Sequence, residues 1–243
     1  MTGKTSAGKV HAGTSGWPYA SWKPKFYPAK LASAKFLGYY AARLNSVEVN
    51  YTFRTQVTSK LLADWIAATP AEFKFAVKAH REITHIKRLR GAAAQTSKFL
   101  KSLEPLRDAG KLGPVLFQLP PFLKCDIALL EDFLDTLRYQ TRAAMEFRHP
   151  SWFVDDVFDR LGRANVALCQ AESDKLETPD VATADFRYLR LRKEKYSASA
   201  REKKSNRVAE AAQRGDVFAY FKHQDTPAGA LYAESLLSAG KTG

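Results

Sequence analysis

Short apolar runs, rich in β-branched and aromatic residues, recur along the chain and alternate with segments that have helical spacing. The eight runs read HAGTSGW, SVEVNYTF, FKFAVKAH, PVLFQLP, AAMEFRH, NVALCQAE, FRYLRLR and VFAYFKH. Their length and composition, with polar and turn-forming residues between them, predict eight β-strands.

Between these runs, apolar residues recur at spacings of three and four, which predicts amphipathic helices. In the first such segment Leu31, Leu37 and Leu44 share one face. Asp126 is a suitable N-cap for a later helix and Gly110 a suitable C-cap for an earlier one. The segments with this spacing cover residues 31–45, 59–70, 96–110, 126–140, 151–165 and 226–240.

A strand–helix unit repeated eight times within 243 residues predicts an α/β protein that is a single-domain (β/α)8 TIM barrel. We expect the barrel to span residues 10–240 and residues 1–9 to form a flexible N-terminal tail. A doubly wound open sheet is the alternative. Eight strands without a glycine-rich nucleotide-binding turn favour the barrel.

Polar side chains occur at the end of strand after strand, where TIM barrels carry their chemistry. Side chains alternate across a strand, so two polar residues separated by one apolar residue share a face. Because the intervening valines, leucines and aromatics suit packing against outer helices, the polar groups are expected to point into the barrel mouth. These groups are Glu48 and Asn50, Lys78 and His80, Gln118, Glu146 and Arg148, Arg190 and Arg192, and Lys222.

The candidate catalytic residues are two carboxylates, one lysine and one histidine. Glu146 is the first candidate for a general acid or base, and Glu48 is a second carboxylate on the opposite side of the barrel. A structural role for each, in a Glu–Arg pair or in bonds to the backbone, is the alternative. Lys78 is a candidate anion ligand, electrophile or Schiff-base nucleophile, and His80 a candidate acid–base group.

Substrate binding is expected to involve the remaining strand-end groups. Arg190 and Arg192 on the seventh strand, with Lys222 after the eighth, match the position at which TIM barrels often bind phosphate. The other expected ligands of the substrate are Asn50, Gln118 and Arg148. Trp17 and Tyr19, after the first strand, are candidates for stacking on a ligand, or for a hydrophobic lid.

Composition and charge limit the classes of partner that the chain is expected to bind. The chain is 45% hydrophobic, carries a net charge of +13 and has a pI of about 9.7. From Arg187 to Lys222 eleven basic residues stand against four acidic ones. This excess favours anionic partners, either a small anionic molecule, for example a phosphorylated one, or a nucleic acid. The alternative is that these basic residues belong to a solvated helix on a generic surface and mark no partner.

Membranes, disulfides and cofactors are not expected. No apolar run approaches the roughly 18–20 residues of a membrane span, and the N-terminus has no signal-peptide core. The two cysteines form no CxxC motif, which favours a cytoplasmic protein with reduced thiols. No cofactor is predicted; a divalent metal held by His80, His149 and nearby glutamates is the alternative. The sequence indicates no oligomeric state.

Five ordered motifs resemble the YecE-like family, also called domain of unknown function 72. They are GTSGW-x-Y-x-x-W-x-x-x-FYP, SVEVNYTF, WIAATPAEFKFAVKAHREITH, LGPVLFQLPP and EFRHPSW, and the resemblance covers the chain from about residue 11. The resemblance implies a TIM barrel and an uncharacterised function. Where the family commonly has His-Gly and an Asn pair after its last two strands, this chain has Arg192-Lys193 and Lys222-His223.

Three functions remain open at this point. The first is an enzyme that acts on a phosphorylated or other anionic molecule, whether hydrolase, isomerase or lyase. The second is a nucleic-acid-binding protein or nuclease that uses the basic segment 187–214. The third is a non-catalytic scaffold.

Overall fold

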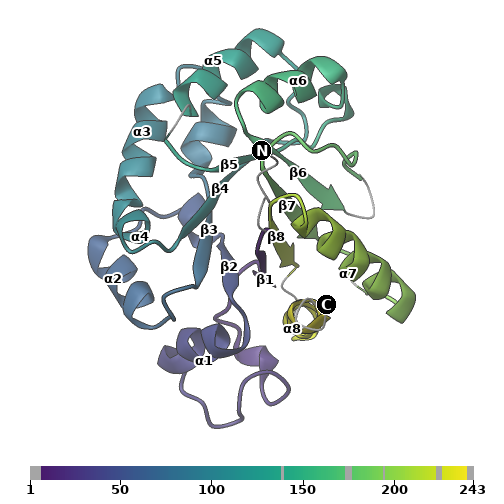
Figure 1. The fold of residues 1–243 in the computed structure, drawn as a ribbon. Coiled ribbons are helices and arrows are strands. Elements are labelled where there is room, and N and C mark those ends of the chain that lie inside the picture. Colours follow the sequence, from purple (N-terminus) through teal and green to yellow (C-terminus); the bar gives the residue numbers. More distant parts are fainter. Residues whose placement is uncertain (1–6, 138–139, 173–176, 194, 223–225, 240–243) are drawn as a thin grey trace, which may run out of the picture.

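The structure is a computed structural model that describes residues 7–137, 140–172, 177–193, 195–222 and 226–239. Its eight strands are all parallel and follow the order β1-β8-β7-β6-β5-β4-β3-β2. The strands form a nearly closed barrel with the helices outside it (Figure 1), which confirms the predicted (β/α)8 fold. The strands are β1 Val10–Thr14, β2 Ser46–Val49, β3 Lys74–Lys78, β4 Leu112–Gln118, β5 Ala143–Glu146, β6 Ala167–Glu172, β7 Phe186–Leu191 and β8 Asp216–Phe221.

Each predicted segment contains a helix, with three differences from the expected pattern, the first being that the helix at Ala198–Ala212 lies in none of these segments. The helices are α1 Phe36–Arg43, α2 Ser59–Ala67, α3 Ala93–Ser102, α4 Glu104–Asp108, α5 Ile127–Leu137, α6 Asp155–Arg163, α7 Ala198–Ala212 and α8 Ala228–Ala239. The segment 96–110 contributes to two helices because Pro105, in the first turn of α4, cannot continue α3 without a clash. Between β6 and β7, the described residues 177–185 contain no helix, so that one repeat departs from the expected unit.

Side chains join β1 to β2, the two ends of the sheet order. Asn45 donates from Nδ2 to the Val10 carbonyl at 2.8 Å, and its Oδ1 accepts from the Ala12 N–H at 2.9 Å. The hydroxyl of Tyr40 accepts from the Thr14 N–H at 2.8 Å. These bonds satisfy backbone groups of β1 that would otherwise lie at an open sheet edge.

Gly13 permits the close approach of the two strands at this seam. A Cβ atom at position 13 would lie 1.8 Å from the carbonyl oxygen of Ser46 and 2.6 Å from the hydroxyl of Tyr40. Tyr40 in turn donates to that same Ser46 oxygen at 3.0 Å. The seam therefore requires a residue without a side chain at this position.

The lower part of the barrel interior is filled by side chains. Large aromatic residues from β7 and β8 meet small residues from β3, β5 and β6, so the interior is packed and is not a pore. Among the residues of this inner layer are Ala76, Leu116, Ala144, Ala167, Cys169, Phe186, Tyr188, Phe218 and Tyr220. A larger apolar layer lies between strands and helices and includes Val47, Val77, Met145 and Phe147, as the alternation predicts.

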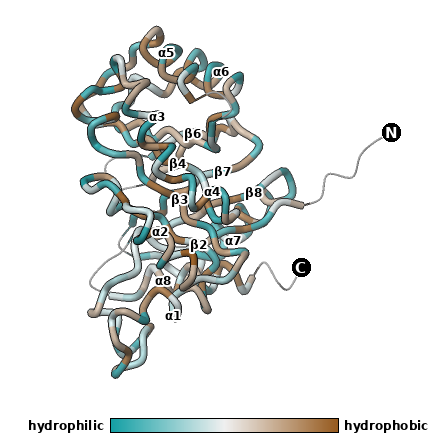
Figure 2. The backbone as a smooth tube through the Cα atoms, turned by 90° about the vertical axis from the view of Figure 1, so that its left-hand side faces the viewer, coloured by the Kyte–Doolittle hydropathy of each residue, from teal (hydrophilic) through white to brown (hydrophobic). Residues whose placement is uncertain are grey.

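Hydropathy along the chain follows this layering. Hydrophobic and hydrophilic stretches alternate along the outer helices α5 and α6 (Figure 2), as amphipathic helices require. Within the described residues, no helix is both long and apolar enough to cross a bilayer. Of the expected tail, residues 1–6 lie outside the described residues, whereas the Gly8 N–H donates to the Ala212 carbonyl at 2.7 Å.

Candidate active site at the barrel mouth

A cavity of about 1280 Å³ lies at the carboxyl ends of the strands. Among the described residues, six basic side chains and two carboxylates border it, together with two aromatic rings from the loop after β2. Its lining comprises Asn50, Tyr51, Phe53, Arg54, Thr55, Lys78, Gln118, Pro121, Glu146, Phe147, Arg148, Pro150, Ala171, Glu172, Arg190, Arg192 and Lys222. The strand-end polar groups thus converge on one space with a marked excess of positive charge.

Eight of the twelve residues singled out from the sequence line this cavity. They are Asn50, Lys78, Gln118, Glu146, Arg148, Arg190, Arg192 and Lys222. Seven of them lie at or next to the last residue of their strand, and Arg148 lies two residues beyond the end of β5. The remaining four, Glu48, His80, Trp17 and Tyr19, lie elsewhere.

Arg190 joins the two predicted carboxylates beneath the cavity. Its Nη1 donates to Oε2 of Glu146 at 2.5 Å, and its Nη2 donates to Oε1 of Glu48 at 2.7 Å. The side chain is 2% exposed, and its Nε has no hydrogen-bond partner among the described residues. Arg190 is therefore a buried guanidinium held between two carboxylates, and its burial is tolerated because its positive charge is paired.

Glu48 lies below the cavity, fully buried at 0% exposure. Besides Arg190, it accepts hydrogen bonds from the hydroxyl of Ser15 at 2.8 Å and from that of Tyr188 at 2.9 Å. Burial alone would raise the pKa of Glu48, but Arg190 and Arg192 outweigh it and lower the pKa to about 2. Glu48 is thus a permanently ionised anchor for the groups around it, out of reach of a ligand in the cavity.

Glu146 occupies the complementary position, on the cavity wall. Its Oε1 accepts from Nε2 of Gln118 at 2.8 Å, and its Oε2 holds Arg190. The register pairs Gln118 with Glu146 across β4 and β5, which places their side chains on the same inward face. Of the two carboxylates proposed from the sequence, Glu146 is the one that borders the cavity.

Lys78 completes this chain of polar contacts. Its Nζ donates to Oε1 of Gln118 at 2.7 Å and lies 4.1 Å from the centre of the Phe53 ring. No described carboxylate lies within ion-pair distance of this ammonium group. Burial and the nearby charge of Arg190 lower the pKa of Lys78 to about 8, although Glu146 and Glu48 oppose the shift.

Arg192 is the second cation near the bottom of the cavity without a carboxylate in ion-pair distance among the described residues. Its Nη1 lies 3.4 Å from the hydroxyl of Ser15. Burial and the neighbouring charge of Arg190 lower the pKa of Arg192. An arginine stays protonated despite such a shift, so Arg192 brings to the cavity a positive charge that Glu48 and Glu146 offset only from beyond ion-pair distance.

His80 borders a different cavity. It lies two residues beyond the end of β3, where the chain turns into the π-helical segment Glu82–Ile86, and its Nδ1 accepts from the Glu82 N–H at 3.3 Å. With Gln95 and Lys98 it lines a space of about 240 Å³ against α3. The predicted common face of Lys78 and His80 is therefore wrong, because strand alternation ends with the strand.

Trp17 and Tyr19 pack beside the barrel mouth and do not belong to the described cavity lining. Trp17 makes an edge-to-face contact with Trp65, and the hydroxyl of Tyr19 donates to the Ser15 carbonyl at 3.1 Å. Contacts of this kind within the protein fit the alternative for Trp17 and Tyr19, a hydrophobic lid, better than stacking on a ligand. Tyr51 and Phe53 supply the aromatic surface in their place.

The functional residues that sequence reasoning missed include Ser15, Tyr51, Phe53, Arg54 and Tyr188. The signal for Tyr188 was available, because it lies two residues before Arg190 on the same strand and so shares its inward face. Tyr51 and Phe53 follow β2 in a 3-10 turn, where no simple periodicity fixes the direction of a side chain. Ser15 likewise follows the last residue of β1.

The remaining candidates for metal binding are engaged elsewhere. Glu172 accepts hydrogen bonds from the hydroxyl of Tyr196 and, at 2.7 Å, from Nζ of Lys204 on α7. His149 interacts through Nδ1 with the hydroxyl of Ser151 at 2.8 Å. The described residues contain no group of three His, Cys, Asp or Glu side chains placed to hold a metal ion. His223 lies outside the described residues.

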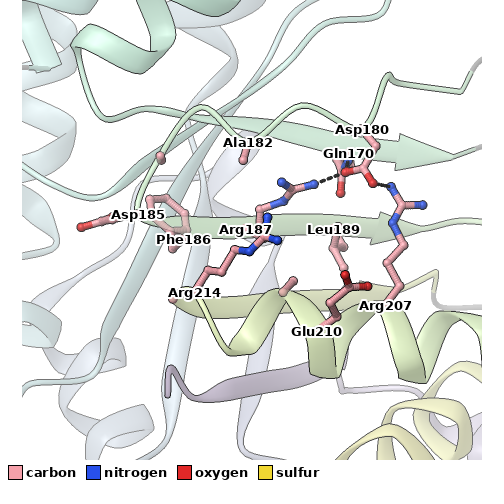
Figure 3. A pocket seen from close by; sticks show the side chains of 13 residues that line it. Gln170, Asp180, Ala182, Asp185, Phe186, Arg187, Leu189, Arg207, Glu210 and Arg214 are labelled. Carbon is pink, nitrogen blue, oxygen red and sulfur yellow. Dashed lines mark hydrogen bonds and ion pairs between the residues drawn. The ribbon is translucent and has the colours of Figure 1, made fainter. Parts of the chain in front are cut away.

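The basic segment contributes to a second pocket, outside the barrel. A space of about 340 Å³ lies between the outer face of β6–β7 and α7, next to the described stretch without a helix. Figure 3 shows Asp180 between Arg187 and Arg207, with which it forms ion pairs, while Gln170 also contacts it. Several cations of this segment are thus neutralised within the protein.

Comparisons with known proteins agree with the fold and supply no reaction. The family described as "Protein of unknown function DUF72" matches residues 11–242. The UPF0759 protein YunF of Bacillus subtilis is 31% identical over 160 residues, 62% of this chain and 55% of YunF. The UPF0759 protein YecE of Escherichia coli K12 is 28% identical over 145 residues, 59% of this chain and 50% of YecE. The aligned parts thus span about half the length of these relatives.

Two solved structures show the same architecture over the whole barrel. A DUF72 family protein from Thermotoga maritima has a TM-score of 0.83 and 25% identity, covering 95% of this chain and 98% of the other. A DUF72 family protein from Enterococcus faecalis has a TM-score of 0.79 and 16% identity, covering 96% of each chain.

Proposed function

This chain belongs to the DUF72 family of TIM barrels, and we propose that it is an enzyme that binds an anionic, for example phosphorylated, small molecule in the cavity at the barrel mouth. The observation that carries the proposal is the charge of that cavity: six basic side chains against two carboxylates among its described residues. Glu146 is the proposed proton-transfer group, and Lys78 and Arg192 are the proposed contacts of the substrate.

The pairing of the lining charges supports an anionic ligand. Glu146 is matched by Arg190, and Glu172 by Lys204 from outside the cavity. Lys78 and Arg192, deeper in the cavity than the rim residues Arg54 and Arg148, have no such partner among the described residues. Uncompensated cations in a partly desolvated space attract anions more strongly than the same cations on an open surface.

Glu146 has the geometry of a proton-transfer group held in one orientation. Both of its oxygens are hydrogen-bonded, one to Gln118 and one to Arg190, and its side chain borders the cavity. Two fixed partners keep a carboxylate in position for a bound substrate. Glu48 serves as a positioning residue in this proposal, because it holds Arg190 from below without touching the cavity.

The binding part of the proposal is tested with inorganic phosphate. Isothermal titration at constant ionic strength should show phosphate binding to the parent protein and weaker binding to Arg192→Gln. A lost charge-assisted hydrogen bond costs about 1.5–3 kcal/mol, which corresponds to roughly a tenfold or greater rise in Kd. Arg214→Gln, which removes a cation from the outer pocket, is the matched control and should bind phosphate like the parent. Equal binding by both variants would contradict the assignment.

The catalytic part is tested by screening phosphorylated and carboxylated metabolites for turnover. Glu146→Gln keeps the shape of the side chain and removes the group that exchanges a proton, so turnover should fall by about 10²–10⁴-fold. Because Glu146 also pairs with Arg190, urea unfolding of the variant must show that it is folded under the assay conditions. Turnover that persists in folded Glu146→Gln would remove Glu146 from the mechanism.

The nucleic-acid alternative is less well supported. Within the described part of the segment 187–214, Arg187 and Arg207 pair with Asp180, and Lys204 pairs with Glu172. Each of these pairs reduces the charge left to neutralise a phosphate backbone. A gel shift at low salt that retards DNA or RNA, and that is lost as the salt concentration rises, would favour this alternative.

A further inference from the structure

We propose that the substrate of this site is an anionic aldehyde or ketone, and that Nζ of Lys78 forms an imine with its carbonyl carbon. This inference rests on the proposed function and narrows it to a substrate class. Its basis is the placement of the Lys78 amine in the cavity, beside an aromatic ring and an amide oxygen that links it to the carboxylate of Glu146.

Two contacts fix the direction of the Lys78 amine, while burial and the neighbouring arginines disfavour its charged form. One side of Nζ lies over the Phe53 ring, and the other is held by Oε1 of Gln118 at 2.7 Å. Arg190 and Arg192 line the same cavity, and their charges disfavour a further positive charge on Lys78. An ion-paired lysine would lack this property, since a direct carboxylate partner stabilises the protonated form.

The consequence is a larger fraction of reactive, neutral amine. With its pKa lowered to about 8, Lys78 is neutral in about one molecule in ten at pH 7. An exposed lysine with an ordinary pKa is neutral in only about one molecule in 2,500 at that pH. Nucleophilic lysines in proteins are activated by the same combination of desolvation and neighbouring cations.

The covalent step balances without any further reagent. The lone pair of the neutral Lys78 amine attacks the carbonyl carbon, and the carbonyl oxygen takes up a proton to give a carbinolamine. The nitrogen loses one proton, and the hydroxyl group leaves as water after it is protonated, so that a protonated imine remains. The amine, the carbonyl compound and one proton thus give the iminium ion and one water molecule.

Neighbouring residues match the needs of this step. Gln118 links the amine to Glu146, because its Oε1 accepts from Lys78 and its Nε2 donates to Glu146. Glu146 is therefore held close to the reacting centre, where a carboxylic acid would protonate the leaving hydroxyl group. Arg192 and the cations of the rim, Arg54 and Arg148, offer contacts for the anionic part of the same molecule.

The inference is tested by trapping the imine with cyanoborohydride. The full-length protein is incubated with glyceraldehyde 3-phosphate, or with neutral glyceraldehyde at the same concentration, and then digested with trypsin. A reduced adduct on Lys78 blocks cleavage at that site and appears in the peptide of residues 75–81. We expect this adduct at least tenfold faster with the phosphorylated aldehyde, and a pH profile with a midpoint near 8.

Two variants sharpen the assignment. Lys78→Arg keeps the charge but cannot form an imine, so it should give no adduct in this peptide, and the adduct should not move to another lysine. Lys60→Arg changes an exposed lysine on α2, outside the cavity, and should leave the trapping at Lys78 in place. The peptide map and pH profile of the parent protein decide the question even if Lys78→Arg does not fold.

The outcomes separate this inference from the proposed function. Phosphate binding that depends on Arg192, without preferential trapping at Lys78, overturns the inference and leaves the anion site standing. Labelling of Lys78 at the rate of exposed lysines, or with a midpoint near 10, also overturns it. Absence of both phosphate binding and trapping overturns the two together.

Discussion

Glu48→Gln is the substitution that most directly probes the charge network beneath the cavity. The change conserves the size of the side chain and removes its negative charge. Glu48 is 0% exposed and accepts from Ser15, Tyr188 and Arg190 at 2.7–2.9 Å. An amide at this position cannot accept all of these bonds, because one of its two polar atoms is a donor.

The expected cost follows from the partners that remain. Breaking a buried ion pair by removing one partner costs about 3–5 kcal/mol. Arg190 keeps Glu146 as a second partner at 2.5 Å, so we expect the lower end, about 3 kcal/mol. For a protein of this size that corresponds to a drop in Tm of about 6–12 °C.

The assay is urea unfolding at pH 7, followed by circular dichroism, with Glu131→Gln as the matched control. Glu131 makes the same kind of bond to Arg160, at 2.7 Å, but its side chain is 51% exposed. Surface pairs contribute about 0–1 kcal/mol, so the control should unfold close to the parent. A Glu48→Gln protein that unfolds within the range of the control would refute the view that this carboxylate anchors Arg190.

The same variant has a characteristic pH dependence. The pKa of Glu48 is lowered to about 2 in the folded protein, so its contribution to stability is complete above the ordinary glutamate pKa and is lost as the pH falls toward 2. The difference in unfolding free energy between parent and Glu48→Gln should therefore narrow as the pH falls below about 4.5. A difference that is constant with pH would point to packing as the cause.

Two further predictions concern the base and the seam of the barrel. Gly13→Ala should lower the Tm by at least 5 °C or prevent soluble expression, because its Cβ would lie 1.8 Å from the Ser46 carbonyl oxygen. Gly162→Ala is the control, since a Cβ at that position meets nothing within 4 Å. Equal Tm values for the two variants would contradict the close approach of β1 and β2. His11 is 5% exposed, stacks on Phe218 at 4.5 Å and has its pKa lowered by burial to about 4. Its neutral form is favoured in the folded state, so stability should fall by up to about 3 kcal/mol as the pH decreases from 6.5 to 4. In urea unfolding between pH 6.5 and 4, the free energy of unfolding of His11→Gln should fall less steeply with pH than that of the parent. An equal slope in both proteins would exclude His11 as the source of the pH dependence.

The fold could be predicted because its signals are local. Each strand is a short apolar run whose composition favours extended structure wherever it occurs, as FKFAVKAH and AAMEFRH illustrate. The absence of a helix from the described residues between β6 and β7 was not predicted, because the strand–helix repeat was inferred from the other units and extended to this one. The division of residues 93–108 into α3 and α4 had a visible cause in Pro105.

The candidate site could be predicted in part. Alternation along a strand fixes which side chains point inward, and the parallel barrel brings all strand ends to one side, so Lys78, Glu146 and Arg190 were placed correctly. The rule becomes unreliable beyond the end of a strand, although Arg148, two residues past Glu146, still lines the cavity. His80, two residues past Lys78, follows the turn toward α3 and leaves the inner face.

The sequence by itself determined the barrel and the identity of the polar groups that its strands carry to one end. It did not determine how deep each group lies, because depth depends on the register of eight strands that are distant along the chain. That register buries Glu48 beneath Arg190 and leaves Glu146 at the cavity wall, although both are glutamates near the end of an inward-facing strand. Only the tertiary structure separates the carboxylate that anchors the barrel interior from the one that a substrate would meet.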